Sequence, residues 1–318
     1  MASIPVDLFN PGQVFACVGF LEAAEVLLGD AIGGFDWRYE EHVRFELSSR
    51  GERNPFDVVL GFLAEADICC RVPVGYANSL PVSKRRKGRK DDGESQEEDD
   101  SDLFDRVEAE DTFPGPKGDP MALPIRLVAP IDGRTRTLCI GHWADASSRN
   151  DFKLYAGNRS AATIARAMLR GTREKPKKGE MKGAVRTRGI DSLWNSREEL
   201  VANPFDVLTP MGGSFNFDPR GAWIAIDAGY SPNDHKHVVS ASPVVEILAA
   251  VGMEHARPDE YETRRVRYGA WGGLVPPILA RAALGCARIG IPLRTFQFML
   301  DLSGKNKVVT IAKEEISG

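Results

Sequence analysis

Apolar side chains recur at helical spacing behind Asn-Pro pairs. Asn can cap a helix by accepting a hydrogen bond from a free backbone N–H, and Pro at the first helical position has no N–H to leave unpaired. Three such pairs occur, at Asn10-Pro11, Asn54-Pro55 and Asn203-Pro204. After the first pair, the apolar residues near a 3.6-residue period are Val14, Val18, Leu21 and Leu28. We therefore predict that a helix begins at each pair, and further helices at 159–170, 243–254 and 275–287.

Two similarities within the chain bear on whether it contains a repeat. The string Asn-Pro-Phe-Asp-Val occurs at 54–58 and again at 203–207. We interpret it as two similarly capped helices and not as a repeat. Segments 9–27 and 240–258 share a second pattern, in which a Pro near the start is followed by a Val-rich turn that ends in Val-Gly.

Period-two alternation and turn residues predict the strands. Residues 43–48 alternate apolar and polar side chains, and residues 124–129 and 135–140 flank Asp132-Gly133, a strong hairpin signal. A second hairpin is predicted near the end of the sequence, turning at Ser303-Gly304-Lys305, and 223–229 is predicted to be a buried strand. Strands and helices interleave without a regular βαβ rhythm. The predicted fold class is α+β, with mixed sheets, packed helices and one long charged disordered insertion.

The predicted insertion spans residues 83–118 and divides an N-terminal α/β part, 1–82, from an α+β remainder, 119–318. Six basic residues at 84–90 precede a run rich in Asp and Glu. Low hydrophobicity and blocks of charge cannot repay the entropy of ordering, so we interpret the segment as a solvated linker. The basic block within it could alternatively act as a nucleic-acid arm.

Charge is distributed unevenly over the rest of the chain. The formal net charge is −4, but outside residues 83–111 there are 34 basic and 33 acidic residues. Nine basic residues gather at 166–188 against two acidic ones, Glu174 and Glu180. The nine are Arg166, Arg170, Arg173, Lys175, Lys177, Lys178, Lys182, Arg186 and Arg188. Such a patch can neutralise phosphates and release counterions, so it is the first candidate nucleic-acid contact; a solvated basic loop is the alternative.

Two other segments are weaker candidates for the same role. Arg264, Arg265 and Arg267 are interleaved with Tyr261 and Tyr268. Arg can bind phosphate in a bidentate manner and Tyr can stack on a base, although a strand with a charged face explains the same pattern. The Gly-rich loop at 212–223 could let backbone and aromatic groups approach a partner, or could be only a turn before the next strand.

Signals for catalysis or metal binding are weak. The turn at 227–231 resembles the first phosphate motif of sugar-kinase-type ATPases, but no second copy is found. His235 and His237 would need two further ligands to hold zinc. A nuclease would need carboxylates such as Asp218, Asp227 and Asp234 to converge, which their spacing does not predict. We therefore expect no enzyme activity, no cofactor and no metal.

Composition points to a protein of a reducing compartment. The 318 residues include five cysteines without a Cys-x-x-Cys pair, no apolar run approaches the roughly 20 residues of a membrane span, and the N-terminal residues do not form a signal sequence. We therefore expect a cytoplasmic protein with no membrane partner.

Several phrases of the chain resemble proteins of type I-U (also called I-G) CRISPR loci. They are VDLFNPGQVFACVGFLEAA, FKLYAGNRSAATIARAML, GGSFNFDPRGAWIAIDAGYSPND and SPVVEILAAVG, which together cover about a quarter of the chain. The resemblance implies a large-subunit-like, non-catalytic component of an antiviral RNA-guided (Cascade-type) ribonucleoprotein. Its partners would be guide RNA, target DNA and the other subunits, and it would help recognise the target-adjacent motif or stabilise the opened strands.

The chain is short for a large subunit. A small-subunit or guide-binding role in the same complex therefore stays open. The alternatives from other classes are a metal-dependent nuclease or ATPase that uses Asp227, and a scaffold that contacts only proteins.

Overall fold

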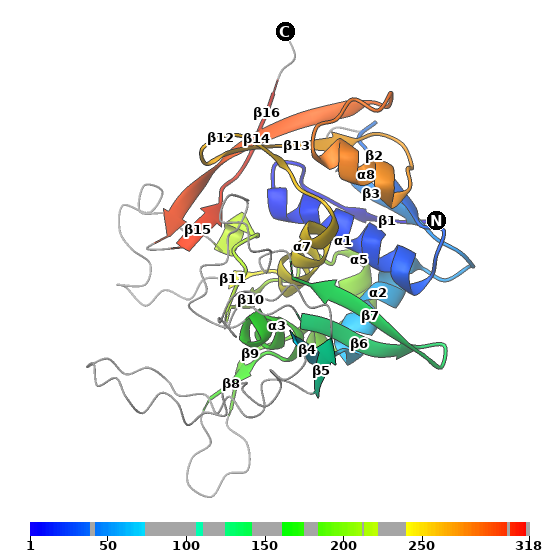
Figure 1. The fold of residues 1–318 in the computed structure, drawn as a ribbon, viewed down its shortest axis with the longest axis vertical. Coiled ribbons are helices and arrows are strands. Elements are labelled where there is room, and N and C mark those ends of the chain that lie inside the picture. Colours follow the sequence, from blue (N-terminus) through cyan, green and yellow to red (C-terminus); the bar gives the residue numbers. More distant parts are fainter. Residues whose placement is uncertain are drawn as a thin grey trace, which may run out of the picture.

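The computed structural model describes most of the chain in nine stretches. They are residues 1–38, 42–73, 106–110, 125–141, 161–174, 184–211, 213–221, 240–303 and 306–315. At 70–73, 106–110, 302–303 and 306 it describes the backbone alone. Helices and small sheets of mixed type make up these stretches, which confirms the α+β class (Figure 1).

The order strand, helix, strand, strand, helix, strand occurs twice. The first unit consists of β1 (Ala2–Pro5), α1 (Pro11–Leu27), β2 (Ile32–Asp36), β3 (Arg44–Ser48), α2 (Pro55–Glu65) and β4 (Asp67–Pro73). The second consists of β11 (Ser240–Ala241), α7 (Pro243–His255), β12 (Asp259–Glu262), β13 (Arg265–Trp271), α8 (Pro277–Leu284) and β14 (Leu293–Ser303). This is the element order of a ferredoxin-like unit. All four helices begin with a Pro, so the likeness between 9–27 and 240–258 is part of a longer structural repeat.

Shorter elements lie between the two units and after the second. Those between are β5 (Arg106–Glu110), β6 (Ile125–Ile131), β7 (Arg134–Ile140), α3 (Ala161–Arg170), β8 (Thr172–Arg173), β9 (Val185–Thr187), α4 (Ile190–Leu193), η6 (Trp194–Ser196), α5 (Arg197–Ala202), β10 (Thr209–Pro210) and η7 (Pro219–Gly221). After the second unit come β15 (Asn306–Val309) and β16 (Lys313–Glu314).

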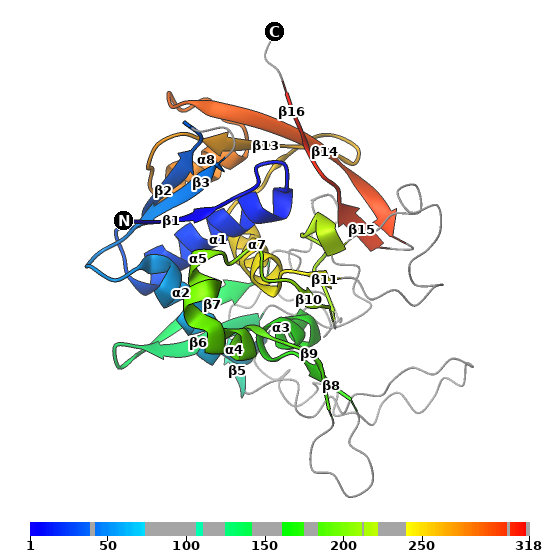
Figure 2. The ribbon, with the colours of Figure 1, turned by 180° about the vertical axis from the view of Figure 1, so that it is seen from behind.

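The sheets depart from two separate ferredoxin-like units. The first unit forms the antiparallel sheet β1-β3-β2, while β4 joins the sheet β5-β4-β6-β7. In the second unit, β12, β13 and β14 form a sheet with β15 and β16, whereas β11 pairs with β10. Reciprocal hydrogen bonds of 3.0 Å between Gly33 and Val275 link β2 to the segment after β13. The C-terminal sheet lies at one end of the molecule, the β8–β9 hairpin at the other, and α1 and α7 between them (Figures 1 and 2).

The crossing of α1 and α7 forms the centre of the fold. Both helices are buried over most of their length, so they carry apolar residues on nearly every side. A Cβ on Gly19 would lie 2.0 Å from the Leu248 carbonyl oxygen, and one on Gly252 would lie 2.5 Å from the Phe15 carbonyl oxygen. Glycine is therefore required at both places for the two backbones to approach this closely.

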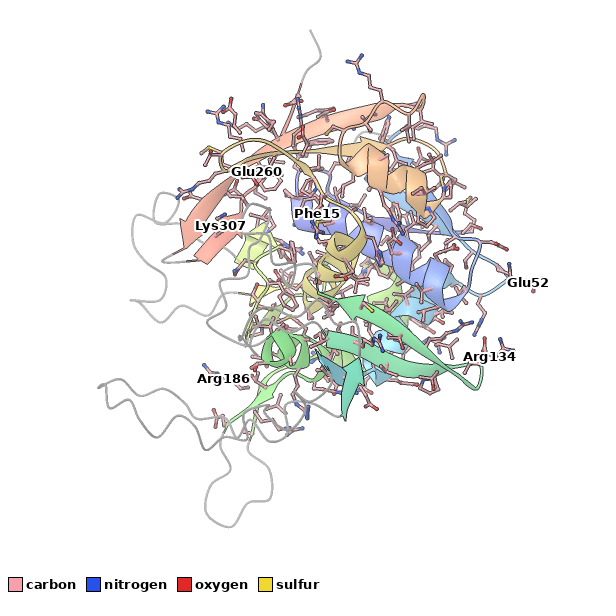
Figure 3. The ribbon with its side chains drawn as sticks, in the orientation of Figure 1. Phe15, Glu52, Arg134, Arg186, Glu260 and Lys307 are labelled. Carbon is pink, nitrogen blue, oxygen red and sulfur yellow. The ribbon has the colours of Figure 1, made fainter. Side chains whose placement is uncertain are left out.

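Aromatic residues of the second unit fill the space against the first. Trp271 packs edge-on against Phe35, with ring centroids 5.0 Å apart, and its Nε1–H donates to the Gly33 carbonyl at 2.8 Å. Tyr268 packs against Phe15, which lies near the centre of the molecule (Figure 3). One hydrophobic core therefore runs through both units.

Most of the predicted elements are confirmed. Asn10 accepts from the Gln13 N–H at 3.2 Å and Asn54 accepts from the Phe56 N–H at 3.0 Å, each at the start of its helix. Asp132 and Gly133 both have positive φ in the turn between β6 and β7. The helices α3, α7 and α8 and the hairpin of β14 and β15 lie where they were expected. The predicted strand at 223–229 lies outside the described residues.

The helix predicted at Asn203-Pro204 is wrong. Asn203 is the C-cap of α5, and the chain makes a single turn at 203–206. The Pro204 carbonyl accepts from the Ser242 hydroxyl at 3.2 Å, and the Phe205 carbonyl accepts from the Arg220 guanidinium at 2.8 Å. A helix would need these carbonyls for its own N–H groups, so tertiary contacts replace it.

Part of the predicted insertion at 83–118 forms a strand. Residues 106–110 form β5, which pairs in parallel with β4, whereas the other residues of the segment lie outside the described ranges. Backbone pairing to an existing strand orders β5 despite its charged sequence. Among the described residues, no helix has both the length and the apolar character needed to cross a bilayer.

Candidate nucleic-acid interface

The described part of the basic segment is a short antiparallel hairpin neck, which we define as residues 171–174 and 184–189. Thr172 pairs with Thr187 and Arg173 with Val185. The two threonine hydroxyls lie 2.8 Å apart in a hydrogen bond, and the Thr172 N–H donates to Thr187 Oγ1 at 2.9 Å. A last contact, from the Glu174 N–H to the Ala184 carbonyl at 2.8 Å, closes the neck.

Two glycines hold the base of the neck. Gly171 has φ of +70°, ends α3, and a Cβ there would lie 2.2 Å from the Thr187 carbonyl oxygen. Gly189 caps α4, and a Cβ there would lie 2.3 Å from the Gly171 nitrogen. The two strands thus approach more closely than side chains would allow, which ties the hairpin to α3 and α4.

The nine predicted basic residues have different surroundings. Arg173, Arg186 and Arg188 are exposed on the neck, and Arg186 points away from the core (Figure 3). Arg166 is half-buried on α3. The lysines of the segment, Lys175, Lys177, Lys178 and Lys182, lie outside the described residues.

Arg170 serves the fold. Its guanidinium donates to the Ala64 carbonyl at 2.7 Å and the Ala66 carbonyl at 2.8 Å, with a longer contact of 3.4 Å to Glu65. These are carbonyls at the end of α2, which no intrahelical N–H satisfies, and a cation there also complements the helix dipole. Arg170 therefore anchors α3 to α2, and its guanidinium is already occupied by the fold.

The second arginine cluster is matched by carboxylates. Arg265 lies 3.3 Å from Glu262, and Arg267 lies 2.7 Å from Asp259 and 3.8 Å from Glu315. The hydrogen bond that Arg267 donates to the Asp259 carboxylate raises the pKa of Arg267. Arg264 is exposed in the turn between β12 and β13, where its N–H donates to Glu260. A phosphate at this cluster would have to compete with carboxylates already in place.

The two tyrosines beside this cluster do not form a stacking platform. Tyr268 is fully buried, its ring stacks on Phe296, and its hydroxyl donates to the Leu8 carbonyl at 2.6 Å. The expectation that Tyr268 could stack on a base is therefore wrong. Tyr261 donates to Gln297 at 2.8 Å, and the Arg267 guanidinium lies over its ring. Alternation along β13 turns Tyr268 inward.

The described part of the Gly-rich loop at 212–223, residues 213–221, packs inside the molecule and bonds to both central helices. Phe215 and Phe217 are both buried, so this part presents no aromatic surface. The Asp218 carboxylate accepts from Asn10 Nδ2 at 3.3 Å, from the Ser242 N–H at 3.0 Å, and from the Arg220 guanidinium at 2.8 Å. One buried carboxylate thereby joins the N-termini of α1 and α7. Asp218 is accordingly occupied as a structural acceptor, whereas Asp227 and Asp234 lie outside the described residues.

Glu246, near the start of α7, accepts two further hydrogen bonds from this loop. Its two carboxylate oxygens accept from the Phe215 N–H at 2.7 Å and from the Asp218 N–H at 2.8 Å. Burial raises the pKa of Glu246 to about 7, and the negative charge of Asp218 contributes in the same direction. The two backbone N–H groups and the Ser214 hydroxyl act against this rise, because they favour the charged form.

The raised pKa of Glu246 predicts a specific pH dependence of stability. The folded state holds this proton up to about pH 7, whereas an unfolded glutamate releases it near pH 4.3. The contribution of Glu246 is therefore complete below the unfolded pKa and is lost as pH rises through 7, on the order of 3 kcal/mol. We expect the difference in unfolding free energy, wild type minus Glu246→Gln, to fall by this amount between pH 4.5 and 7.5.

Denaturant titrations at several pH values measure this difference. The two proteins can also differ in stability by an amount that is independent of pH, because the amide of Gln meets the same N–H groups at every pH. Only the change of the difference with pH tests the prediction. A difference that does not change with pH, or that grows as pH rises, would contradict it.

Sequence reasoning missed Glu246, Arg220 and the threonine pair of the neck. A signal was present for Glu246, since it is a lone carboxylate in the otherwise apolar stretch 243–253. Arg220 pairs with Asp218 only two residues before it, but no local pattern indicates that this carboxylate is buried. Thr187 was missed because its partner, Thr172, lies 15 residues away.

The described residues offer no evident metal site. Within the stretches given above, no three His, Cys, Asp or Glu side chains gather closely enough to hold an ion, and His235 and His237 lie outside these stretches. Comparison of the chain with models of known families, with curated proteins and with solved structures found no match.

Proposed function

We propose that this protein is a non-catalytic, cytoplasmic subunit of an RNA-guided CRISPR type I-U/I-G effector complex. It helps to bind guide RNA and target DNA beside the target-adjacent motif or along the opened strands. The phrases described under Sequence analysis supply the assignment to this complex. Its contact with nucleic acid is the neck together with the basic residues 175–183 between its two strands.

The proposed contact rests on the neck, whose two strands approach closely at Gly171 and Gly189. It holds exposed arginines at a fixed place at one end of the molecule, and its two strands connect to the two ends of a segment with four lysines. Lys and Arg of such a hairpin can contact phosphates and release their counterions. The carboxylates around Arg265 and Arg267 make the C-terminal cluster a weaker candidate.

Charge reversal of the lysines tests this proposal. Changing Lys175, Lys177, Lys178 and Lys182 together to Glu should weaken capture of nucleic acid by the assembled complex. Each lost phosphate contact reduces the slope of log affinity against log salt by about 0.9 on duplex DNA or about 0.7 on a single strand. Four contacts would thus remove roughly 3 to 4 units of slope. A salt titration of DNA capture by wild-type and variant complexes measures it.

Circular dichroism of the variant provides the folding control. Superimposable titrations would assign the lysines to solvent. Metal-dependent DNA cleavage that is lost in Asp227→Ala, but kept in a variant of an exposed aspartate outside the candidate set, Asp206→Ala, would instead favour the nuclease alternative. Assembly with the other subunits that is insensitive to salt and gives no nucleic-acid binding would favour the scaffold.

A further inference from the structure

Two exposed arginines of the neck lie on either side of a residue that bonds to the opposite strand. Arg186 and Arg188 flank Thr187, whose side chain is buried and hydrogen-bonded to Thr172. The register shifts at this point, since Thr172 pairs with Thr187 and Arg173 with Val185, so Arg186 is the extra residue of a bulge, and Arg188 follows the end of β9. Both are exposed. The threonine pair and the close approach of Gly171 and Gly189 tie this strand to its partner and to α3.

The composition of the segment restricts what it can recognise. Residues 166–188 include no Phe, Tyr, Trp, His, Asn or Gln. Proteins that grip single strands without sequence preference stack bases on aromatic side chains, and adenine is read by the amides of Asn or Gln. Neither kind of contact is available in this segment. Its Lys and Arg side chains can bind phosphates, and Arg can in addition bind guanine, so the test must separate these two contacts.

We infer that Arg186 and Arg188 form a clamp for the phosphate backbone of double-stranded nucleic acid, which positions the duplex without reading its sequence. This rests on the proposed function and names the ligand class of the same hairpin. A hairpin tied to the fold at its base suits a backbone of fixed spacing, whereas a flexible single strand gains nothing from it.

Double substitution of the arginines tests the clamp in the full-length protein. Arg186→Gln with Arg188→Gln removes two charges but keeps polar side chains. On a mixed-sequence DNA duplex we expect the salt slope to fall by about 1.8, so that the ratio of wild-type to variant affinity shrinks about tenfold between 50 and 200 mM salt. A second duplex with permuted sequence should give the same loss within about twofold. A single strand of the same length should show a smaller change.

Two matched variants separate this role from general charge. Arg50→Gln with Arg53→Gln makes the same change of net charge at exposed arginines elsewhere, each in an ion pair with an aspartate, and should leave the slope unchanged. Arg186→Lys with Arg188→Lys keeps both charges and should restore most of it.

Each other outcome overturns a defined part of the inference. Equal slopes for the Arg186/Arg188 and Arg50/Arg53 variants would remove the clamp but leave the proposed function standing. A loss confined to one duplex sequence would show that these arginines read bases, and a loss confined to the single strand would show the wrong ligand. Failure of the wild-type protein to bind any of these nucleic acids, alone or within its complex, would contradict the proposed function and the clamp together.

Discussion

Gly19→Ala should destabilise the protein by about 3 kcal/mol or more, although Ala is intrinsically the better helix former. The added Cβ would lie 2.0 Å from the Leu248 carbonyl oxygen, an atom of the opposing helix backbone that cannot move aside as a side chain could. The helices α1 and α7, both buried over most of their length, must then separate where they cross. Denaturant unfolding of the wild type and the variant measures the loss.

Gly285→Ala is the matched control for this prediction. Gly285 has negative φ at the end of α8, and the closest atom to an added Cβ is the Arg257 carbonyl oxygen at 3.4 Å. We expect its unfolding free energy to change by less than about 1 kcal/mol. If Gly19→Ala were as mild as Gly285→Ala, the close crossing of α1 and α7 would be disproved.

Asp218→Ala should cost about 3 to 5 kcal/mol of unfolding free energy, because it leaves a partly buried guanidinium and several buried donors without their shared acceptor. The donors lost are the side-chain amide of Asn10, the N–H of Ser242 and the guanidinium of Arg220. Both central helices lose a tie at their N-termini. Thermal or denaturant unfolding measures the effect, and Asp218→Asn should recover part of it, since one acceptor oxygen remains.

Asp206→Ala is the control, since Asp206 faces the same guanidinium at 4.0 Å from a largely exposed position. Exposed ion pairs of this kind contribute about 1 kcal/mol or less. A small effect of Asp218→Ala, similar to that of Asp206→Ala, would show that the buried carboxylate is not the tie between the helices.

The starts of three helices and two hairpins could be predicted from the sequence, because their causes are local. Asn10 and Asn54 cap N–H groups two or three residues ahead, and Asp132-Gly133 supplies the positive φ angles that its turn needs. The same pattern at Asn203-Pro204 was misleading. There the carbonyls of the first turn bond to Ser242 and Arg220, which no local rule can anticipate.

The basic hairpin was visible in the sequence as a density of charge, whereas the availability of each charge was decided by the tertiary structure. By formal charge alone, Arg170, Arg186 and Arg267 are equivalent. In the fold, Arg170 binds carbonyls more than a hundred residues earlier, Arg267 binds Asp259 and also lies near Glu315, and Arg186 is exposed on the neck. A guanidinium that already has acceptors must give them up before it can bind a phosphate.

The sequence by itself determined the class of fold, the caps of α1 and α2, and the place where positive charge gathers, because propensity, capping and charge depend on neighbouring residues. Only the tertiary structure decided that Gly19 and Gly252 meet at a helix crossing, that Asp218 is a buried acceptor and that Tyr268 belongs to the core. Those outcomes depend on which atoms come together from positions up to 260 residues apart, as Leu8 and Tyr268 do. Close packing and hydrogen-bond satisfaction act on the assembled chain, not on its segments.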